Sequence, residues 1–374
     1  MLTVLSVVGT RPEAIKMAPV VKALGRHPAR VRSVVCLTGQ HREMLDQALA
    51  VFDVRADEDL AVMEEDQSLA ALTARLVTGL DGVLQKVRPD WVLAQGDTTT
   101  VMAAALAAYY HGVPFGHVEA GLRTGDRRRP FPEEINRRIA DDIADAHFAP
   151  TAVARAALLR EGVAARGIHV TGNTAIDALL EVARRPHDWR TGPLAAVPAT
   201  GRLVLVTAHR RESFGEPLAA ICQAVADVAR GAADVHVVYP VHLNPHVSAT
   251  ATRVLGGLPN VTLTPPLEYP TLVHVMRRAA LVLTDSGGIQ EEAPAFGVPV
   301  LVMRDATERP EGLEAGVARL VGTRRETIAA AARRLLDDPA ERAAMARSAS
   351  PYGDGRAAQR IVAVLLGEPW EPFA

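Results

Sequence analysis

Short apolar runs alternate with longer stretches of helical pattern along almost the whole chain, and this alternation limits the fold more than any other feature. Parallel strands need a long crossover connection, which a helix supplies, so the rhythm is typical of a parallel sheet. The pattern restarts once, which predicts two Rossmann-like α/β domains, each with a doubly wound parallel sheet. The runs occupy residues 2–8, 31–37, 91–94 and 113–118 in the first series, and 168–170, 203–207, 235–239, 261–263, 281–284 and 298–302 in the second.

The length of the chain agrees with two domains, because 374 residues exceed what one hydrophobic core usually organises. We place the boundary near Gly167, so that the first domain comprises residues 1–167 and the second comprises residues 168–355. Residues 356–374 contain an amphipathic stretch, and we expect them to form a terminal helix that returns to the first domain.

Composition and charge exclude several classes of protein. A net charge of −2 gives no nucleic-acid footprint, and no apolar run reaches the roughly 20 residues that a membrane span needs. The chain begins with what reads as a buried strand rather than an export signal, so we expect a cytoplasmic protein. Cys36 and Cys222 lie far apart without metal-ligand spacing, which favours reduced structural thiols over a disulfide or a zinc site.

Ligands bind open parallel sheets at the carboxyl ends of the strands, so the residues that follow each strand are of most interest. The first such segment is residues 9–16 (GTRPEAIK), where Arg11 and Lys16 stand at the start of a helix. Cations oppose the helix dipole at that end, and a bound anion shared with the helix would explain them. The alternative is that both are solvated surface charges.

A second segment, residues 285–292 (DSGGIQEE), follows an apolar strand and opens a helix. Gly287 and Gly288 would let phosphate oxygens approach the backbone N–H groups, and Ser286 could cap the helix or donate a hydrogen bond. Glu292, one turn further, could accept hydrogen bonds from ribose hydroxyls. A glycine pair is a weak signal by itself, and a plain helix cap remains the alternative.

Three acids follow strands or their turns in the first half of the chain, namely Asp97, Glu119 and Glu133. If their strands are neighbours, the carboxylates share one cleft, where burial and repulsion raise pKa values into the range for acid–base catalysis. Two structural alternatives stay open. Asp97 could cap a helix, and Glu119 could be a partner for Arg123.

His209 follows a strand of the second domain, where it would face the first domain and either neutralise a phosphate or relay a proton. Arg309 is a further cation after a later strand. The dinucleotide-binding pattern GxGxxG, the P-loop pattern and the HExxH zinc pattern are all absent from the sequence, so the classes of protein that depend on them lose their support.

Taken together, these motifs resemble those of the non-hydrolysing UDP-N-acetylglucosamine 2-epimerases. The resemblance covers almost the whole chain, and the agreement in order and spacing makes it more specific than any single motif. The motifs are residues 9–13 (GTRPE), 40–42 (QHR), 96–98 (GDT), 117–123 (HVEAGLR), 132–134 (PEE), 209–212 (HRRE), 286–292 (SGGIQEE) and 308–311 (ERPE).

The resemblance implies the glycosyltransferase-B architecture, in which two Rossmann-like domains face each other across a cleft, and a homodimer. It implies interconversion of UDP-N-acetylglucosamine and UDP-N-acetylmannosamine for envelope polysaccharide synthesis, without a metal or a nicotinamide cofactor. By matching position it also assigns roles to residues. The catalytic residues would be Asp97, Glu119, Glu133 and His209. Arg11, Lys16 and Arg309 would hold the charge of the substrate, Ser286, Gly287 and Gly288 would bind its diphosphate, and Glu292 would bind its ribose.

Many bacterial relatives bind a second UDP-N-acetylglucosamine as an activator, and the resemblance assigns this site to Gln40, His41, Arg210 and His242, with Glu133 nearby. The match is incomplete. Glu43 and Asp66 stand where certain relatives have a glutamine and an arginine, and Leu267 replaces a substrate-binding glutamine that some relatives have.

Three other functions remain open at this stage. A glycosyltransferase of the same architecture would need the same diphosphate site, but also an acceptor site and at most one base. A hydrolysing epimerase would release UDP and free N-acetylmannosamine. A non-catalytic nucleotide-sugar sensor would keep the diphosphate site and could lose the acids, all three of which are present here.

Overall fold

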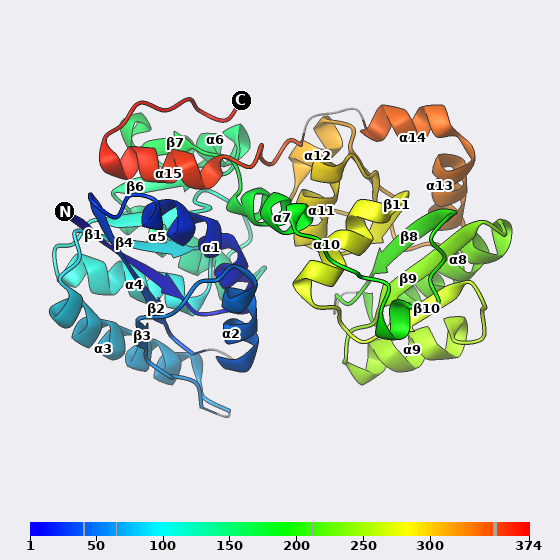
Figure 1. Ribbon diagram of the computed structural model, residues 1–374, viewed down its shortest axis with the longest axis horizontal. Coiled ribbons are helices and arrows are strands. Elements are labelled where there is room, and N and C mark those ends of the chain that lie inside the picture. Colours follow the sequence, from blue (N-terminus) through cyan, green and yellow to red (C-terminus); the bar gives the residue numbers. More distant parts are fainter. Residues whose placement is uncertain (40–41, 65, 211–212, 347–349) are drawn as a thin grey trace. The chain divides into compact units, whose positions relative to one another are not determined.

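The computed structural model divides the chain into two compact units. The first comprises Met1–Leu180 and Tyr352–Ala374, and the second comprises Glu181–Pro351. In each unit helices surround a parallel sheet (Figure 1). The residues that the structure describes are 1–39, 42–64, 66–210, 213–346 and 350–374.

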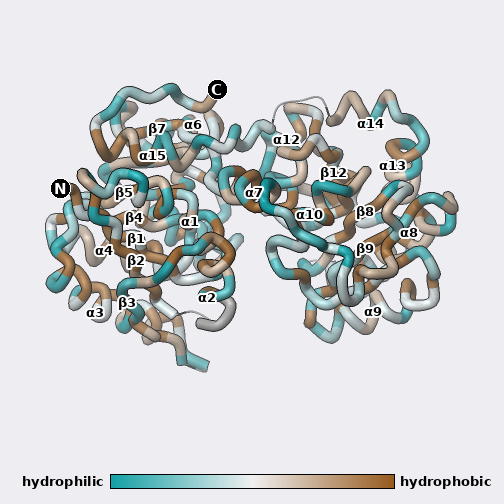
Figure 2. Tube along the Cα trace, viewed as in Figure 1, coloured by the Kyte–Doolittle hydropathy of each residue, from teal (hydrophilic) through white to brown (hydrophobic). Residues whose placement is uncertain are grey.

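The first domain contains a seven-stranded sheet in the order β3-β2-β1-β4-β5-β6-β7, and every described pair is parallel. Its central strands β1 (LTVLSVV) and β4 (WVLAQ) consist mostly of apolar residues, as expected of strands that are covered on both faces (Figure 2). The strands are β1 (Leu2–Val8), β2 (Val31–Leu37), β3 (Glu58–Asp59), β4 (Trp91–Gln95), β5 (Phe115–Val118), β6 (Ala146–Ala149) and β7 (Ile168–Val170).

Helices α3 and α4 cover one face of this sheet and enclose a hydrophobic core with it. Leucines at helical spacing on α3, such as Leu76 and Leu80, pack with Leu5 of β1 and with the alanine-rich helix α4. Helix α15 packs beside α1, and the end of the chain belongs to this compact unit. The helices are α1 (Arg11–Gly25), α2 (Arg42–Val51), α3 (Leu69–Val87), α4 (Thr99–Tyr110), α5 (Glu133–Ile143), α6 (Ala152–Arg160), α7 (Thr174–Arg184) and α15 (Ala357–Leu366).

The second domain repeats this plan with six parallel strands in the order β10-β9-β8-β11-β12-β13. The strands are β8 (Arg202–Thr207), β9 (Val235–Pro240), β10 (Val261–Thr264), β11 (Leu281–Thr284), β12 (Val300–Val302) and β13 (Ala318–Leu320). The helices are α8 (Glu216–Gly231), α9 (Pro245–Leu255), α10 (Tyr269–Arg278), α11 (Gly287–Glu292), α12 (Pro310–Glu314), α13 (Arg325–Asp337) and α14 (Pro339–Ala346).

The strand order reverses once in each sheet, between β1 and β4 in the first and between β8 and β11 in the second. Such a reversal opens a crevice at the carboxyl ends of the two strands, where doubly wound sheets bind their ligands. The prediction of two doubly wound parallel-sheet domains is confirmed.

The boundary between the domains differs from the one we expected near Gly167. Strand β7, which we expected to open the second domain, pairs with β6 in the first sheet, with His169 opposite Phe148. The division between the compact units falls inside α7, between Leu180 and Glu181. An apolar run predicts a strand but not the sheet that it joins, which is why the sequence placed the boundary too early.

The two cysteines, Cys36 and Cys222, are both buried and free, and burial raises the pKa of each thiol to about 12. No helix in the described part of the chain is both long and apolar enough to cross a membrane. Within the same residues, no cluster of three or more histidine, cysteine or acidic side chains is arranged to hold a metal ion.

Candidate active site

The acids and cations singled out in the first domain lie after strands or at the starts of helices, except Lys16, which lies in the second turn of α1. Arg11 opens α1 after β1, Asp97 follows β4, Glu119 follows β5, and Glu133 opens α5. Because β1, β4 and β5 are neighbours, their carboxyl ends meet at one edge of the sheet. A side chain at Gly9, the first residue after β1, would collide with residues of the adjacent segments, so the turn there requires glycine.

Glu13 is a buried carboxylate that joins the turns after β1 and β4. Its Oε2 accepts hydrogen bonds from the N–H groups of Gly9 and Thr10, at 2.6 and 3.0 Å, and its Oε1 accepts one from the Thr98 hydroxyl, at 2.5 Å. Thr10 and Glu13 also form a capping box at the start of α1. Burial raises the pKa of Glu13 to about 7, although these hydrogen bonds oppose the change.

Glu119 is held by a cation and an amide. Lys16 Nζ lies 2.5 Å from Glu119 Oε2, and Gln95 Nε2 donates to the same oxygen at 3.0 Å. The Lys16 and Glu119 side chains are only 17 % and 8 % exposed, so Lys16 is not the solvated charge of our alternative interpretation. Glu119 also has a left-handed backbone, with φ at 67°, which costs a residue other than glycine about 1–3 kcal/mol and is common at functional sites.

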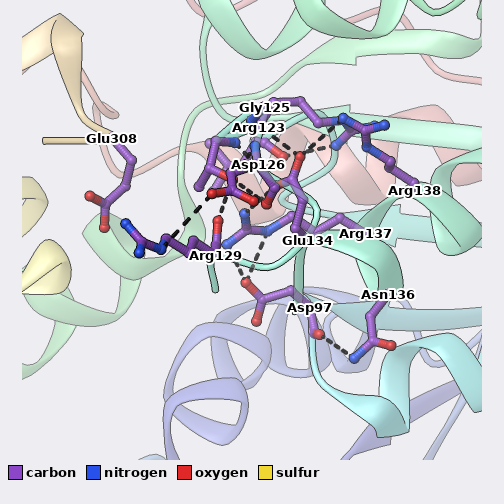
Figure 3. A network of polar contacts seen from close by, with 12 residues as sticks. Asp97, Arg123, Gly125, Asp126, Arg129, Glu134, Asn136, Arg137, Arg138 and Glu308 are labelled. Carbon is purple, nitrogen blue, oxygen red and sulfur yellow. Dashed lines mark hydrogen bonds and ion pairs between the residues drawn. The ribbon is translucent and has the colours of Figure 1, made fainter. Parts of the chain in front are cut away.

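Asp97 is fixed from helix α5. The Nε and Nη2 groups of Arg137 donate to Asp97 Oδ2 at 3.0 and 2.5 Å, and the Asn136 amide donates to the Asp97 carbonyl oxygen at 2.9 Å. Figure 3 shows Arg137 between Asp97 and Glu134. The helix after β4 is capped at Thr98 rather than at Asp97, so the alternative that Asp97 is a helix cap is wrong.

Two adjacent acids at the start of α5 have different surroundings. Glu134 is fully buried and accepts hydrogen bonds from the N–H groups of Thr124 and Gly125 and from Arg137. The Oε2 atom of Glu133 is also buried but has no hydrogen-bond partner among the described residues. Glu134 therefore organises the loop before α5, whereas Glu133 keeps a buried oxygen without a hydrogen-bond partner among these residues.

A buried histidine ties the turn after β4 to the end of β5. His117 Nδ1 lies 2.6 Å from Asp141 Oδ1, and His117 Nε2 lies 2.7 Å from the Gly96 carbonyl oxygen. Burial alone lowers the pKa of His117, but Asp141 and the Gly96 carbonyl raise it above its ordinary value, and both ring nitrogens face acceptor oxygens. Arg123 binds Asp141 and Glu161. This rules out the alternative in which Arg123 is the partner of Glu119.

In the second domain, His209 follows β8 and lies against a buried carboxylate. The N–H groups of His209 and Arg210 donate to Asp285 Oδ2 at 2.7 and 2.8 Å. The ring of His209 stacks on that of His242, with centroids 5.6 Å apart. Burial lowers the pKa of His209 and Asp285 opposes this only in part, which favours a neutral imidazole that relays a proton over a fixed cation.

The turn after β11 leaves backbone N–H groups at the start of α11. Ser286 occupies the cap position, but its side chain makes no capping hydrogen bond, so the plain helix cap does not describe it. Its own N–H donates to the Thr284 hydroxyl at 2.9 Å. A side chain at Gly288 would meet open space, whereas one at Gly287 would contact the Arg309 guanidinium at 3.4 Å.

Arg309 lies over this turn and is held by two acids. Its Nε donates to the buried Glu291 at 2.7 Å, and its Nη1 lies 3.4 Å from Glu308. Glu308 also binds Arg210 and Arg304, and although burial opposes the change, its arginine partners lower its pKa to about 2. The structure thus collects cations beside the N-terminus of α11.

The expected ribose ligand lies one turn into α11. Glu292 Oε1 accepts a hydrogen bond from the Tyr269 hydroxyl at 3.4 Å. Burial raises the pKa of Tyr269 well above its ordinary value, so the phenol stays a donor. Leu267 packs against the apolar cluster under this part of the sheet.

The expected activator residues are only partly described. Gln40 and His41 lie outside the described residues, as does the side chain of Glu43. Arg210 binds Glu308 and the Asp285 carbonyl oxygen, and His242 is exposed. The activator site stays a prediction.

Several residues of the site escaped the sequence analysis. The spacing of Thr10 and Glu13 is that of a capping box and could have indicated a buried glutamate. Arg137 lies four residues after Glu133 on the same helix, but nothing in the spacing shows that it reaches Asp97. Asp285 stands directly after a strand, where its position was suggestive but its partners were not.

Comparison with known proteins decides the family. The family model described as UDP-N-acetylglucosamine 2-epimerase matches residues 22–366. The chain belongs to the UDP-N-acetylglucosamine 2-epimerase family. Among its relatives, the UDP-N-acetylglucosamine 2-epimerase of Escherichia coli strain K12 is 51 % identical over 370 residues, which are 97 % of this chain and 98 % of that protein.

Solved structures of the epimerase family agree. The UDP-GlcNAc 2-epimerase of Neisseria meningitidis bound to UDP-GlcNAc has a TM-score of 0.91 and 43 % identity, over 98 % of this chain and 100 % of the other. The enzyme of Methanocaldococcus jannaschii in complex with UDP-GlcNAc and UDP has a TM-score of 0.81 and 31 % identity, over 98 % and 100 %. The two parallel-sheet domains are thus those of the epimerases with the glycosyltransferase-B fold.

Proposed function

We propose that this chain is a non-hydrolysing UDP-N-acetylglucosamine 2-epimerase that interconverts UDP-N-acetylglucosamine and UDP-N-acetylmannosamine. The observation that carries the proposal is the set of carboxylates at the carboxyl edge of the first sheet, where Asp97, Glu119 and Glu133 each have a different environment. Inversion at carbon needs proton removal on one face of the sugar and proton delivery on the other, and therefore more than one acid–base group.

The C2 proton of the sugar is not next to a carbonyl group, so direct abstraction would be too slow. In the proposed reaction the C1–O bond to the diphosphate breaks, and its electron pair leaves with UDP. A carboxylate removes the C2 proton, and the C2–H electrons form the C1–C2 double bond of 2-acetamidoglucal. Protonation of C2 on the opposite face and return of UDP to C1 then give the epimer, so no net proton or water is consumed.

The second domain would hold the nucleotide during these reaction steps. The Ser286 hydroxyl, the N–H groups of Gly287 and Gly288 and the guanidinium of Arg309 are donors suited to the charge that develops on departing UDP. Glu292 would bind the ribose. In the first domain Arg11 and Lys16 would hold substrate charge, and the Lys16–Glu119 ion pair would place that carboxylate.

The other expectations are proposals on the strength of family membership. They are a homodimer, a cytoplasmic location, a role in supplying envelope polysaccharide synthesis, and a second UDP-N-acetylglucosamine that acts as an activator. A sigmoidal rate curve that persists at early times with UDP-N-acetylmannosamine as the only sugar nucleotide would count against the activator.

Incubation with UDP-N-acetylglucosamine in deuterated water tests the proposed reaction. We expect solvent deuterium at C2 of both epimers and no accumulation of free UDP. Retention of the original hydrogen would refute the mechanism, and release of UDP with free N-acetylmannosamine would instead indicate a hydrolysing epimerase. The Asp97→Asn variant should be inactive, and normal exchange by an inactive variant would contradict the assignment of Asp97.

A further inference from the structure

His209 and Asp285 come from the two strands that flank the strand-order reversal of the second sheet. Strands β8 and β11 pair in parallel, with Thr207 opposite Thr284. His209 is the second residue after β8 and Asp285 the first after β11, so this register brings them together. Asp285 is fully buried, and its Oδ2 is fixed by the N–H groups of His209 and Arg210.

The other oxygen of the Asp285 carboxylate, Oδ1, has a different environment. Asp285 Oδ1 is buried and has no hydrogen-bond partner within the described part of the chain. It lies 3.5 Å from Nδ1 of His209, which is longer than a formed hydrogen bond. The carboxylate is enclosed and the imidazole is 42 % exposed, so a small rotation of the ring can close this gap. Catalytic hydrogen bonds often shorten in this way when substrate binds.

The position of one proton then matters. Burial lowers the pKa of His209, and His242 and Arg210 add to the decrease against the attraction of Asp285. A neutral imidazole carries its proton on one ring nitrogen and a lone pair on the other. The hydrogen-bond partner of one nitrogen therefore decides whether the other nitrogen is a donor or an acceptor. A carboxylate accepts hydrogen bonds and cannot donate them, so it selects a proton on the nitrogen that it faces.

We propose that Asp285 is a positioning residue for His209. It accepts a hydrogen bond from the Nδ1–H group, so that Nε2 is the nitrogen left to exchange a proton or hydrogen bond with the substrate. This inference rests on the proposed function, because it takes His209 to act on the diphosphate or on a proton that moves in the reaction. It adds a residue to that site and gives His209 one tautomer.

The Asp285→Asn substitution tests the proposal with little change in shape. The asparagine oxygen can still accept from the two backbone N–H groups, but its amide presents a donor to His209 Nδ1 and so favours the opposite tautomer. An Asp-to-Asn change of this kind in the serine-protease triad keeps the geometry and lowers kcat by about 10⁴-fold. We expect kcat of D285N to fall by at least about 100-fold, with KM changed by less than about threefold.

A spectroscopic readout separates positioning from a merely structural role. Nitrogen-15 NMR of histidine-labelled protein distinguishes the two tautomers, and the His209 signals are those missing from the His209→Asn variant. We expect the proton on Nδ1 in the unsubstituted protein and on Nε2 in D285N. The same tautomer in both would overturn the proposal. This result does not depend on activity, so it stands apart from a failure of the proposed epimerase function.

A double-mutant cycle gives the kinetic test. If Asp285 acts through His209, the D285N/H209N double variant should be no slower than H209N alone. If the loss of rate in the double variant equalled the product of the losses in D285N and H209N, the proposal would be overturned. Asp234→Asn, a change at an exposed aspartate of the same domain that pairs with Arg202, is the control and should leave kcat unchanged. Equal thermal midpoints of D285N and D234N would exclude unfolding as the cause of a loss.

Discussion

Lys16 of helix α1 and Glu119 after strand β5 form an ion pair, with Nζ 2.5 Å from Oε2. The pair joins segments more than 100 positions apart in the chain, and both side chains are largely shielded from water. Glu119 also has a left-handed backbone at the same place. The ion pair therefore holds a strained residue in the position where the proposed reaction needs a carboxylate.

The Lys16→Met substitution should lower both stability and activity. Loss of one partner leaves a largely buried charge uncompensated, and such losses cost about 3 kcal/mol in free energy of unfolding. We expect the epimerisation rate to fall by at least about tenfold, as for removal of a group that positions a catalytic acid. Urea denaturation and initial-rate measurements check the two effects.

The exposed ion pair between Lys86 and Glu58 is the matched control, since it is also a lysine–glutamate pair in the first domain. Lys86→Met should cost at most about 1 kcal/mol, because solvent screens exposed pairs. It should leave the rate unchanged. Equal destabilisation by the two substitutions would show that burial of the Lys16 pair does not matter.

Glu13 should make stability depend on pH. Burial raises its pKa from 4.5 to about 7, so the folded protein binds the proton more tightly than the unfolded chain between these values. The stability of the protein relative to the Glu13→Gln variant should therefore be greatest below pH 4.5 and fall as the pH rises through 7. The fall amounts to about 3 kcal/mol. Denaturation of both proteins at several pH values measures it, and a constant difference would contradict the prediction.

His117 should also make the protein more stable at low pH than at high pH, for a different reason. Burial lowers its pKa, yet the charge and hydrogen bond of Asp141 raise the pKa above its ordinary value of 6.5. Its contribution is complete below that value and is lost as the pH rises through the raised pKa. The His117→Asn variant should be less stable at pH 6, and the gap should narrow toward pH 9. A gap that widens would mean that the neutral imidazole is the stabilising form.

Gly288 tests the diphosphate site without disturbing the fold. A side chain there meets open space in the protein, so Gly288→Ala should keep or slightly raise stability, because alanine favours a helix over glycine by about 1 kcal/mol. If phosphate oxygens approach this backbone, the added methyl group should weaken UDP binding by at least about tenfold. Calorimetric titration with UDP measures the change.

Gly82 of helix α3 offers the control for this substitution, because a side chain there also meets open space. Gly82→Ala should leave UDP affinity unchanged. Normal UDP binding by Gly288→Ala would contradict the assignment of the diphosphate to this turn.

Much of the fold could be predicted from the sequence, because apolar runs and helical stretches report local structure. The run at residues 281–284 is a buried parallel strand, and the glycine pair after it does open a helix. The partners of the site residues could not be predicted. The same sequence allowed Asp97 to cap a helix and Arg123 to bind Glu119, and the structure shows Asp97 with Arg137 and Arg123 with Asp141.

The sequence by itself determined two parallel-sheet domains and the placing of polar motifs after the strands, since periodicity and turn chemistry act between near neighbours in the chain. Only the tertiary structure decided which strands lie side by side. That order sets β7 in the first sheet, joins Glu13 to Thr98, and brings Asp285 to His209. These contacts form between segments far apart in sequence, and the pairing of strands, which no local pattern encodes, determines their distances.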